Sequence, residues 1–334
     1  MRKAYVTGAG GVVGSHLVEF LKNHGYSVVG SYFTPTTDIT EIDPAIRMVE
    51  LDVRDHQKMM NFIEEELPDV IYHLAAQSRP VPSWDDPYYT FQVNAEGTIG
   101  LLEAVKEARR VYPGYDPKII AISSSAIYGD ALKNYSIESL PDETCELLPL
   151  HPYGVSKAAE DLLCYQYFKN FGIKTIRIRL FNCTGKNKDQ DITGDFVKRA
   201  VVLSRTGGNK LVVGNLQARR AILDVRDLCS ALVLLDEKGE PGEAYNVCSS
   251  HVFQMTHVVE CLEEVTGVHY ELESDPKLFR PADEPLYAGD CAKIKKLGWE
   301  EKYQYIDTIR ASYEYWSKKL LLDDKVDATK WDKF

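Results

Sequence analysis

Long hydrophobic runs are missing from this 334-residue sequence. No apolar stretch approaches the roughly 18 residues that a membrane-spanning helix needs, and strand-like residues begin at Lys3, so we expect no signal peptide. Positive charge is also scarce, because 39 Lys and Arg face 50 Asp and Glu and the net charge is −11. Such a surface repels nucleic acid and anionic membranes. We therefore expect neither of them as a partner, and we expect a cytoplasmic protein.

Paired cysteines are missing too. The seven cysteines are scattered, odd in number and never spaced as C-x-x-C, which disfavours a disulfide framework or a zinc site. We expect reduced thiols and no bound metal. The sequence also contains no internal repeat and no low-complexity segment. Its 44% of hydrophobic residues can form the core of one large domain or of two closely packed ones.

Strand-like and helical patterns alternate along the first half of the chain. Short β-branched runs predict strands, and apolar residues at helical spacing predict helices between them. The predicted strands are residues 3–8, 26–33, 48–53, 70–76, 118–125 and 174–182, and the predicted helices are residues 14–25, 56–67, 90–110 and 158–172. This alternation is typical of a parallel sheet with helices on both faces.

The pattern weakens in the second half. Residues 183–220 are rich in Gly, Lys, Asn and Asp, and a helix and a strand are predicted at 221–237 and 243–249. Amphipathic helices are predicted at 255–267 and 305–321. We expect an α/β fold with a doubly wound parallel sheet (Rossmann) and a smaller C-terminal substrate domain.

The expected division of the chain is discontinuous. We assign residues 1–180 and 221–248 to a Rossmann domain, residues 181–220 and 249–320 to a smaller domain, and residues 321–334 to a charged tail. In open α/β sheets, ligands bind at the carboxyl ends of the strands. We therefore expect the ligand between the two domains.

Three glycines mark the first turn from strand to helix. In "YVTGAGGVVGSH", Gly8, Gly11 and Gly14 follow the first strand and open the first helix. Glycines there allow a tight turn and let backbone N–H groups approach a pyrophosphate, which the helix dipole also favours. Three glycines alone can mark a merely structural turn, but the strand–turn–helix context favours a dinucleotide site.

The residues that select the cofactor are not decisive. NAD usually requires an acidic residue at the end of the second strand, and NADP an arginine nearby. This chain has Ser31 and Tyr32 there, and Asp38 comes later. We predict NAD or NADP without choosing between them. Asp52, in "LDVRD", is either a partner for the adenine amine or a simple turn aspartate.

A tyrosine and a lysine share one face of a predicted helix. Tyr153 and Lys157, in "HPYGVSK", are spaced i and i+4. A tyrosine titrates near pH ~10, but a neighbouring ammonium and a positive nicotinamide favour the phenolate, which makes it an acid or a base near neutrality. The lysine can also hold the cofactor ribose. A lone Y-x-x-x-K is usually a solvated helix face, but the glycine turn and the serine-ended strand make this one specific.

In these motifs the sequence resembles the extended short-chain dehydrogenase/reductase family over nearly its whole length. The shared motifs are "TGAGGVVG", "LDVRD", "HLAAQS", "VNAEGT", "SSSAIYG" and "YGVSK", in this order. The resemblance implies that Tyr153 is the catalytic acid/base, with Lys157 as its partner and Ser124 contributing a hydroxyl. It also implies that Asn94 is the family's helix asparagine and that the protein is a homodimer. Ser123 and Ser125 are implied strand-end residues, with contact to the sugar as the alternative for Ser125. By the same resemblance, the larger domain binds NAD(P) and the smaller one binds the nucleotide sugar.

The C-terminal half resembles the branch of this family that acts on GDP-linked hexoses, which contains GDP-mannose 4,6-dehydratase and GDP-4-keto-6-deoxy-mannose reductase. The stretches "VVGNLQARRAILDVRDL", "EAYNVCS" and "RPADEPLYAGDCAKIKKLGW" carry this resemblance. It implies that Arg220 and Arg280 clamp the diphosphate, because a forked guanidinium suits phosphate oxygens. Asn182 and Lys198 are implied contacts of the same region. A surface ion pair is the alternative for each arginine, and this chain has Arg220-Ala221 where the branch has Arg-Asp.

The segment "SSSAIYG" bears on elimination. It is most similar to the segment of sugar 4-epimerases, and the loss of a glutamate from it does not select between a reductase and an epimerase. A 4,6-dehydratase must remove the C5 proton and expel the C6 hydroxyl, and in the resembling dehydratases a glutamate stands where this chain has Ala126. Alanine cannot shuttle a proton, so elimination is the least supported reaction. We predict a reductase that transfers a hydride to C4 of a GDP-linked 4-keto-6-deoxy-hexose, with a nucleotide-sugar 4-epimerase as the alternative. A dinucleotide-binding scaffold without turnover is disfavoured by intact Ser124, Tyr153 and Lys157.

Overall fold

A seven-stranded parallel sheet forms the centre of the protein, whose computed structural model describes residues 1–189, 191–275 and 286–320. In sheet order, the strands are β11 (Ala244–Val247), β6 (Lys174–Leu180), β5 (Lys118–Ser124), β4 (Val70–His73), β1 (Lys3–Thr7), β2 (Ser27–Tyr32) and β3 (Arg47–Glu50). From β1 the chain adds β2 and β3 on one side and β4, β5 and β6 on the other. This order confirms the predicted doubly wound Rossmann fold.

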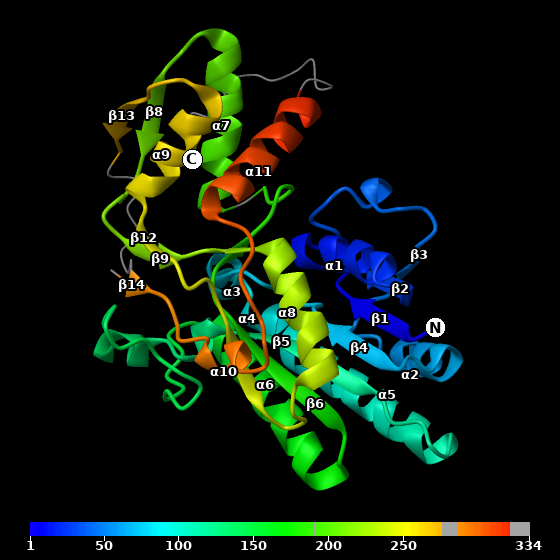
Figure 1. Ribbon diagram of the computed structural model, residues 1–334. Helices are drawn as coiled ribbons and strands as arrows, with labels where there is room; N and C mark the ends of the chain where they lie inside the picture. The colour runs from blue at the N-terminus through cyan, green and yellow to red at the C-terminus, as the bar shows by residue number, and fades with distance from the viewer. Residues whose placement is uncertain (190, 276–285, 321–334) are drawn as a thin grey trace.

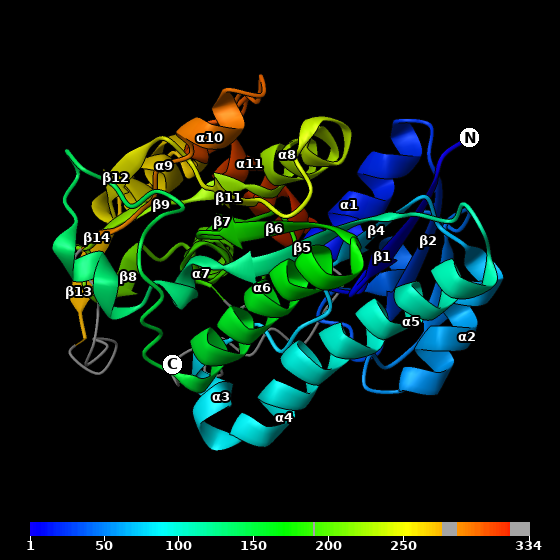
Figure 2. The same ribbon diagram turned by 90° about the horizontal axis from the view of Figure 1, so that it is seen from below.

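Helices cover both faces of this sheet (Figure 2). One layer consists of α1 (Val12–Asn23) and α8 (Val225–Lys238), and the other of α2 (His56–Glu66), α5 (Gly97–Val111) and α6 (Pro152–Phe171). Side chains alternate across a strand, so β1 buries Ala4 and Val6 against the first layer and Tyr5 against the second. Burial on both faces explains why the strands read as continuous apolar runs.

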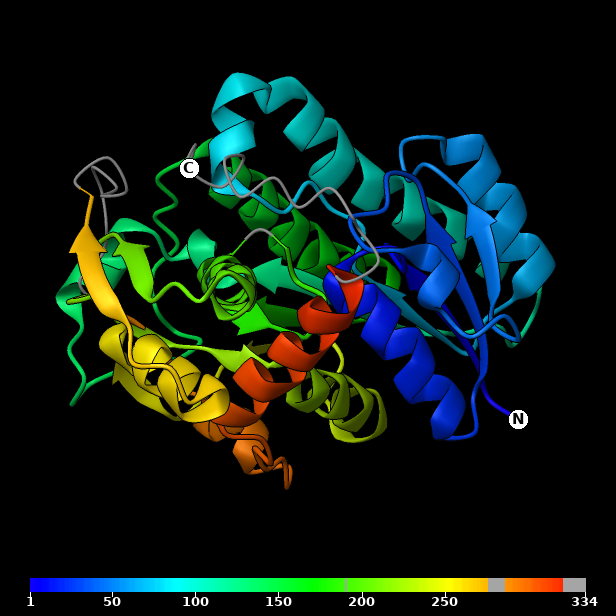
Figure 3. The same ribbon diagram turned by 90° about the horizontal axis from the view of Figure 1, so that it is seen from above.

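The smaller part of the molecule is formed by segments that follow β6 and β11 (Figure 1). Its helices α7 (Ile192–Thr206), α9 (Thr256–Thr266) and α11 (Tyr305–Lys319) pack against one another (Figure 3). Short strands accompany them: β8 (Lys210–Val213) pairs with β13 (Glu271–Ser274), β9 (Arg219–Ala221) with β12 (Val252–Gln254) and β14 (Leu286–Tyr287), and β7 (Cys183–Thr184) with β10 (Leu223–Asp224). The short helix α10 (Ala292–Lys295) packs on β11.

The helix predicted over residues 90–110 is interrupted. After two short helices, α3 (Pro80–Asp85) and α4 (Pro87–Phe91), the backbone forms a π-helical turn at Gln92–Glu96 before α5 begins. Such turns are rare and occur frequently at functional sites. This one buries Asn94 completely, and hydrophobic periodicity alone does not reveal it.

Other boundaries also differ from the sequence-based expectation. The helix predicted at 158–172 begins earlier, at Pro152, because proline suits a first helical turn and His151 Nδ1 caps it by accepting the Gly154 N–H. The helix predicted at 221–237 begins at Val225, after strand β10. The weakly patterned residues 183–220 contain α7, the strands β7 and β8 and the start of β9.

Two buried aspartates at the start of α8 are hydrogen-bonded to residues at the start of α11, in the smaller part of the molecule. Asp227, on α8, accepts the backbone N–H groups of Lys302 and Tyr303, and Asp224 accepts the Thr308 hydroxyl at 2.6 Å. These bonds hold the start of α11 against α8. The division of the chain into domains stays a prediction. Within the described residues, no helix is both long enough and apolar enough to cross a membrane.

Candidate active site

The glycine-rich turn has no room for side chains. Gly8 has φ +68°, and a Cβ there would lie 2.7 Å from the Ala75 nitrogen. A Cβ on Gly14 would lie 2.2 Å from Gly8 O, whereas one on Gly11 would lie 3.3 Å from the same oxygen. The turn therefore requires Gly8 and Gly14 and restrains Gly11 less. Gly10, which the sequence analysis did not select, is also restricted, since its Cβ would meet Pro35 Cβ at 2.8 Å.

A buried histidine is hydrogen-bonded to Thr7, the residue that precedes the glycine turn. His73, at the end of β4, is bonded through Nδ1 to Thr7 Oγ1 at 2.9 Å and through Nε2 to Thr98 Oγ1 at 3.1 Å. Burial lowers the pKa of His73 to about 3, and the nearby Lys157 ammonium contributes to the shift. A neutral imidazole thus joins β1, β4 and α5 directly beneath the glycine turn.

Acid should destabilise the fold through this histidine. An unfolded histidine titrates near pH ~6.5, so the unfolded chain binds a proton that folded His73 excludes until the pH approaches about 3. The free energy of unfolding should therefore fall as the pH drops through this window, by at most about 1.4 kcal/mol per pH unit. Thermal unfolding of His73→Asn should depend less on pH between about 7 and 5. Parallel Tm curves for the two proteins would contradict this account.

The end of β2 does not choose between the two cofactors. Ser31 is buried and bonded to Tyr5 Oη at 2.8 Å, so its hydroxyl does not face a ribose. Asp52 follows β3, and its carboxylate accepts hydrogen bonds from the Arg54 backbone N–H at 3.0 Å, from Nε at 3.0 Å and from Nη2 at 2.6 Å. Partial burial opposes the shift, but these bonds lower the pKa of Asp52. A carboxylate held in this way keeps its charge, and its contact with adenine stays a prediction.

Ser124 and Tyr153 lie in two adjacent segments, the end of β5 and the first turn of α6. Ser124 is the last residue of β5, and its Oγ accepts the Ala126 N–H at 3.1 Å. A Cβ on Gly154 would lie 2.8 Å from Ala126 O, so the first turn of α6 lies against the serine segment. The Tyr153 ring stacks on His151, with centroids 5.8 Å apart. Both predicted catalytic residues are only 8% exposed.

Lys157 extends from α6 toward the same strand. Its Nζ donates to Ile122 O at 2.5 Å and to Glu160 Oε2 at 2.6 Å, and its own carbonyl accepts the Ser123 hydroxyl. Ser123 therefore links the backbone of α6 to the end of β5. The lysine is 3% exposed, so its charge acts in a poorly solvated setting.

Asn94 connects the π-helical turn to the catalytic helix. Its amide nitrogen donates to Ser156 Oγ at 2.9 Å and to Gln77 O at 3.0 Å, and its oxygen accepts the Gln77 N–H. Ser156 in turn donates to Tyr153 O at 2.8 Å. The asparagine therefore fixes the backbone that carries Tyr153.

Tyr287 is a site residue that the sequence analysis missed. It lies on β14, and its hydroxyl is 2.6 Å from Ser125 Oγ, although 162 residues separate the two in the chain. Phe181 packs edge-on against its ring, with centroids 5.7 Å apart. The Ser125 hydroxyl is therefore hydrogen-bonded to a tyrosine other than Tyr153, and Ser125 is the next residue after the predicted catalytic serine, Ser124.

The predicted diphosphate contacts lie in different surroundings. Arg220, on β9, is paired in register with Tyr287, so both side chains leave the same face of that small sheet. Asn182 follows β6, and its carbonyl accepts the Leu223 N–H. Lys198 is buried, ion-paired with Asp189. Arg280 lies outside the described residues.

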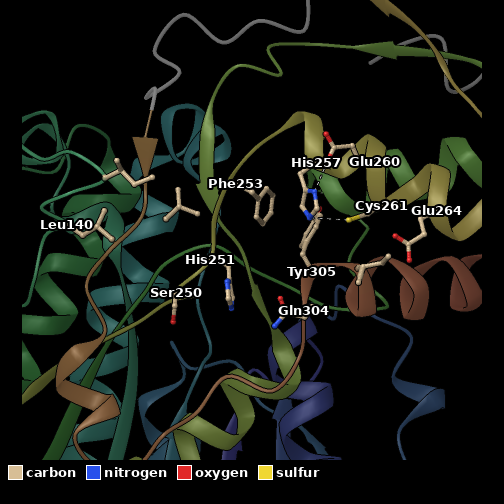
Figure 4. A pocket seen from close by; sticks show the side chains of 13 residues that line it. Leu140, Ser250, His251, Phe253, His257, Glu260, Cys261, Glu264, Gln304 and Tyr305 are labelled. Carbon is tan, nitrogen blue, oxygen red and sulfur yellow. Dashed lines mark hydrogen bonds and ion pairs between the residues drawn. The ribbon is translucent and has the colours of Figure 1, made fainter.

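A separate cavity of about 830 Å³ is lined by none of the predicted site residues (Figure 4). On α9, His257 Nδ1 lies 2.8 Å from Glu260 Oε2, and His257 Nε2 lies 3.4 Å from Cys261 Sγ. The sequence of thiol, imidazole and carboxylate invites comparison with a nucleophilic relay. Burial raises the pKa of Cys261 to about 11, however, so the thiol stays protonated and is no activated nucleophile. Among the described residues, no cluster of three His, Cys, Asp or Glu suits a metal ion.

Known proteins share this arrangement over nearly the whole chain. The family profile described as GDP-mannose 4,6 dehydratase matches residues 5–312. The GDP-6-deoxy-D-mannose reductase of Pseudomonas aeruginosa is 30% identical over 324 residues, which cover 96% of this chain and 98% of that protein. The structure of RMD from Pseudomonas aeruginosa complexed with NADPH covers 96% of this chain and 100% of its own, at 28% identity and a TM-score of 0.81. The Thermus thermophilus UDP-glucose 4-epimerase complex with NAD covers 94% and 98%, at 25% identity and a TM-score of 0.81.

These matches confirm the kinship that the sequence motifs predicted. A family profile that extends from β1 into α11 includes the glycine turn, the serine-ended strand and the Tyr153–Lys157 helix in one alignment. The chain belongs to the GDP-mannose 4,6 dehydratase family, within the extended short-chain dehydrogenases/reductases.

Proposed function

We propose that this protein is an NAD(P)-dependent nucleotide-sugar oxidoreductase that reduces C4 of a GDP-linked 4-keto-6-deoxy-hexose. The segment at the end of β5 supports hydride transfer without elimination, and the likeness to the Pseudomonas aeruginosa reductase favours a reductase over an epimerase. Ser124 accepts a backbone N–H, and Ser125 is bonded to the Tyr287 hydroxyl. Within the described residues, neither serine is hydrogen-bonded to a carboxylate. Hydroxyl groups suit proton transfer to a carbonyl oxygen, whereas elimination needs a further acid/base group.

Each predicted catalytic residue has a distinct role in this reaction. Tyr153 donates the proton that the C4 oxygen gains, and Ser124 donates a hydrogen bond to that oxygen. Lys157 places its positive charge beside the tyrosine. The Gly8–Gly14 turn fits a dinucleotide, because its missing side chains let the first turn of α1 face a pyrophosphate. NADH or NADPH, when bound, supplies the hydride.

We place the sugar and its diphosphate along one line of residues. The hexose lies beside Ser125 and Tyr287, and the diphosphate beside Arg220, because Tyr287 and Arg220 share a face of their sheet. Asn182, Lys198 and Arg280 stay proposed contacts of the diphosphate region. The likeness to the Pseudomonas aeruginosa reductase supports GDP as the nucleotide.

A nucleotide-sugar 4-epimerase is the second candidate. An epimerase oxidises C4, turns the keto-sugar and reduces its other face, so it needs the same hydroxyl groups and no carboxylate at Ala126. The similarity to the Thermus thermophilus UDP-glucose 4-epimerase supports this alternative. A 4,6-dehydratase is the least supported, because Ala126 removes the proton carrier that elimination requires.

We also propose a cytoplasmic homodimer built on residues 90–108 and 153–168. On α6, Val155, Leu162 and Tyr165 are 41%, 53% and 41% exposed, while the opposite face of the helix is buried. One side of α6 is packed against the protein core, so its exposed apolar side is free to pack against the same side of α6 in a second copy of the protein. The resemblance to the family supports the same two helices.

The cofactor content of the purified protein tests this function. After denaturation, a reductase should release little dinucleotide, and the native protein should oxidise added NADPH or NADH only with a GDP-linked 4-keto-6-deoxy-hexose. Stoichiometric NAD⁺, with interconversion of C4 epimers and no net consumption, would establish the epimerase instead. Neither bound nor consumed dinucleotide would refute both. Light scattering of the same preparation should give the mass of a dimer.

A further inference from the structure

The proposed reaction leaves one buried carboxylate beside its lysine unexplained. Glu160 lies one helical turn beyond Lys157 on α6 and is 1% exposed. Its Oε2 accepts from Lys157 Nζ at 2.6 Å, whereas its Oε1 is buried without a hydrogen-bond partner among the described residues. Burying a carboxylate with half of its acceptor capacity unused costs folding free energy. Its presence therefore calls for a reason other than stability.

The ammonium geometry suggests this reason. A lysine has three N–H donors, and the Ile122 carbonyl and the Glu160 carboxylate take two of those of Lys157. Two fixed acceptors determine where the third N–H points. With Ile122 O alone, the ammonium could rotate about a single bond. Glu160 thus fixes an orientation that the rest of the pocket does not.

Among the residues that the structure describes, no other group near the pair is available as the counter-ion of Lys157. Asp161, Cys164, His73 and Arg177 interact electrostatically with this pair or with one another, and Arg179 pairs with Asp161. Asp161 is already paired with both arginines. Burial lowers the pKa of His73 to about 3 and raises that of Cys164, so both are neutral.

We propose that Glu160 is a positioning residue for Lys157, which holds the ammonium beside Ile122 O, leaves its third N–H for the cofactor ribose and offsets part of the positive charge that acts on Tyr153. This inference rests on the proposed function, in which Tyr153 and Lys157 act together. Seven residues of helix place Glu160 about 10 Å from Tyr153. At that distance, an added or removed charge shifts a titration by roughly one pH unit.

Two variants separate position from charge. Glu160→Ala removes the second acceptor, and we expect kcat to fall roughly ten- to hundred-fold, with the KM for the sugar little changed. Glu160→Gln keeps an acceptor but not the charge, so it should retain most of kcat near neutrality. Because the uncompensated ammonium favours the phenolate, the alkaline fall in the reductive rate should move to lower pH by roughly one unit. Burial raises the pKa of Glu160 to about 7, so the two profiles should converge below that pH.

Glu66→Gln is the matched control. Glu66 is also buried and pairs with Lys3 and Arg47, the first residues of β1 and β3. These pairs lie at the amino ends of the strands, whereas Ser124 is at the carboxyl end of β5. Its pH profile should superimpose on that of the wild type. If both Glu160 variants keep the wild-type profile and kcat, and lose only thermal stability as Glu66→Gln does, the positioning role is wrong.

A measurement of cofactor binding tests the role of Glu160 even if no turnover is detected. Titrated by dinucleotide fluorescence, Glu160→Ala should bind NAD(P)H roughly ten-fold more weakly than the wild type, and Glu66→Gln should not. A wild type that binds the cofactor but turns over no nucleotide sugar would refute the proposed function alone. Equal affinities in the wild type and Glu160→Ala would refute the role of Glu160 alone.

Discussion

Replacing Tyr153 with phenylalanine should lower turnover by roughly 10²–10⁴-fold while the protein still binds its dinucleotide. The change removes one hydroxyl and keeps the ring that stacks on His151. The backbone carbonyl that accepts the Ser156 hydroxyl is also unaffected. The start of α6 should therefore keep its position. Rates of NADPH and NADH oxidation, measured beside a binding titration, give the two quantities to compare.

Tyr167→Phe is the control for this experiment. Tyr167 lies on the same helix, is 7% exposed and donates its hydroxyl to Glu103 Oε1 at 2.6 Å, away from the serine segment. Its removal should lower thermal stability by about 1 kcal/mol and leave turnover unchanged. If Tyr153→Phe keeps turnover within a few-fold of the wild type, the proton comes from another group, and Tyr287 becomes the first residue to test.

Gly14→Ala should abolish dinucleotide binding and destabilise the fold. Alanine is about 1 kcal/mol better than glycine inside a helix, and Gly14 lies in the first turn of α1. Its Cβ would nevertheless lie 2.2 Å from Gly8 O, far inside van der Waals contact. Forcing α1 and the turn apart should cost about 3 kcal/mol, so the steric effect outweighs the gain in helix propensity. A fluorescence titration and a thermal melt measure the two consequences.

Gly11→Ala in the same turn provides the comparison. A Cβ there would lie 3.3 Å from Gly8 O, and φ is −92°, which any residue can adopt. We expect a loss of about 1 kcal/mol, as for an alanine at a helix N-cap, with weakened but measurable binding. Equal behaviour of the two alanine variants would mean that the overlap at Gly14 is relieved at little cost.

The sheet could be predicted because its signals are local. Each parallel strand is a short apolar run bounded by turn residues. The glycines of the first turn are visible in the sequence, and a side chain at Gly8 or Gly14 would overlap backbone atoms. Tyr153 and Lys157 are one turn apart on a helix, so their proximity also follows from spacing. The π-helical turn at Gln92–Glu96 was missed because it depends on packing.

The remaining site residues depend on contacts across the chain. Tyr287 reaches Ser125 only after β14 has paired with β9, and no short pattern predicts that pairing. Glu160 follows Lys157 closely in sequence, but a glutamate on a helix is usually solvated. Only the burial of α6 against β5 and β6 turns it into a counter-ion.

The late position of β11 in the sequence also affects how the protein is made. β11 pairs with β6 along its whole length, from Ala244 opposite Arg177 to Val247 opposite Leu180, yet α7 and α8 are translated between the two strands. While the ribosome completes them, β6 presents a free edge, and free edges recruit other strands. Chains that stop before residue 244 keep this edge permanently. Premature termination should therefore yield aggregating fragments rather than a soluble cofactor-binding half.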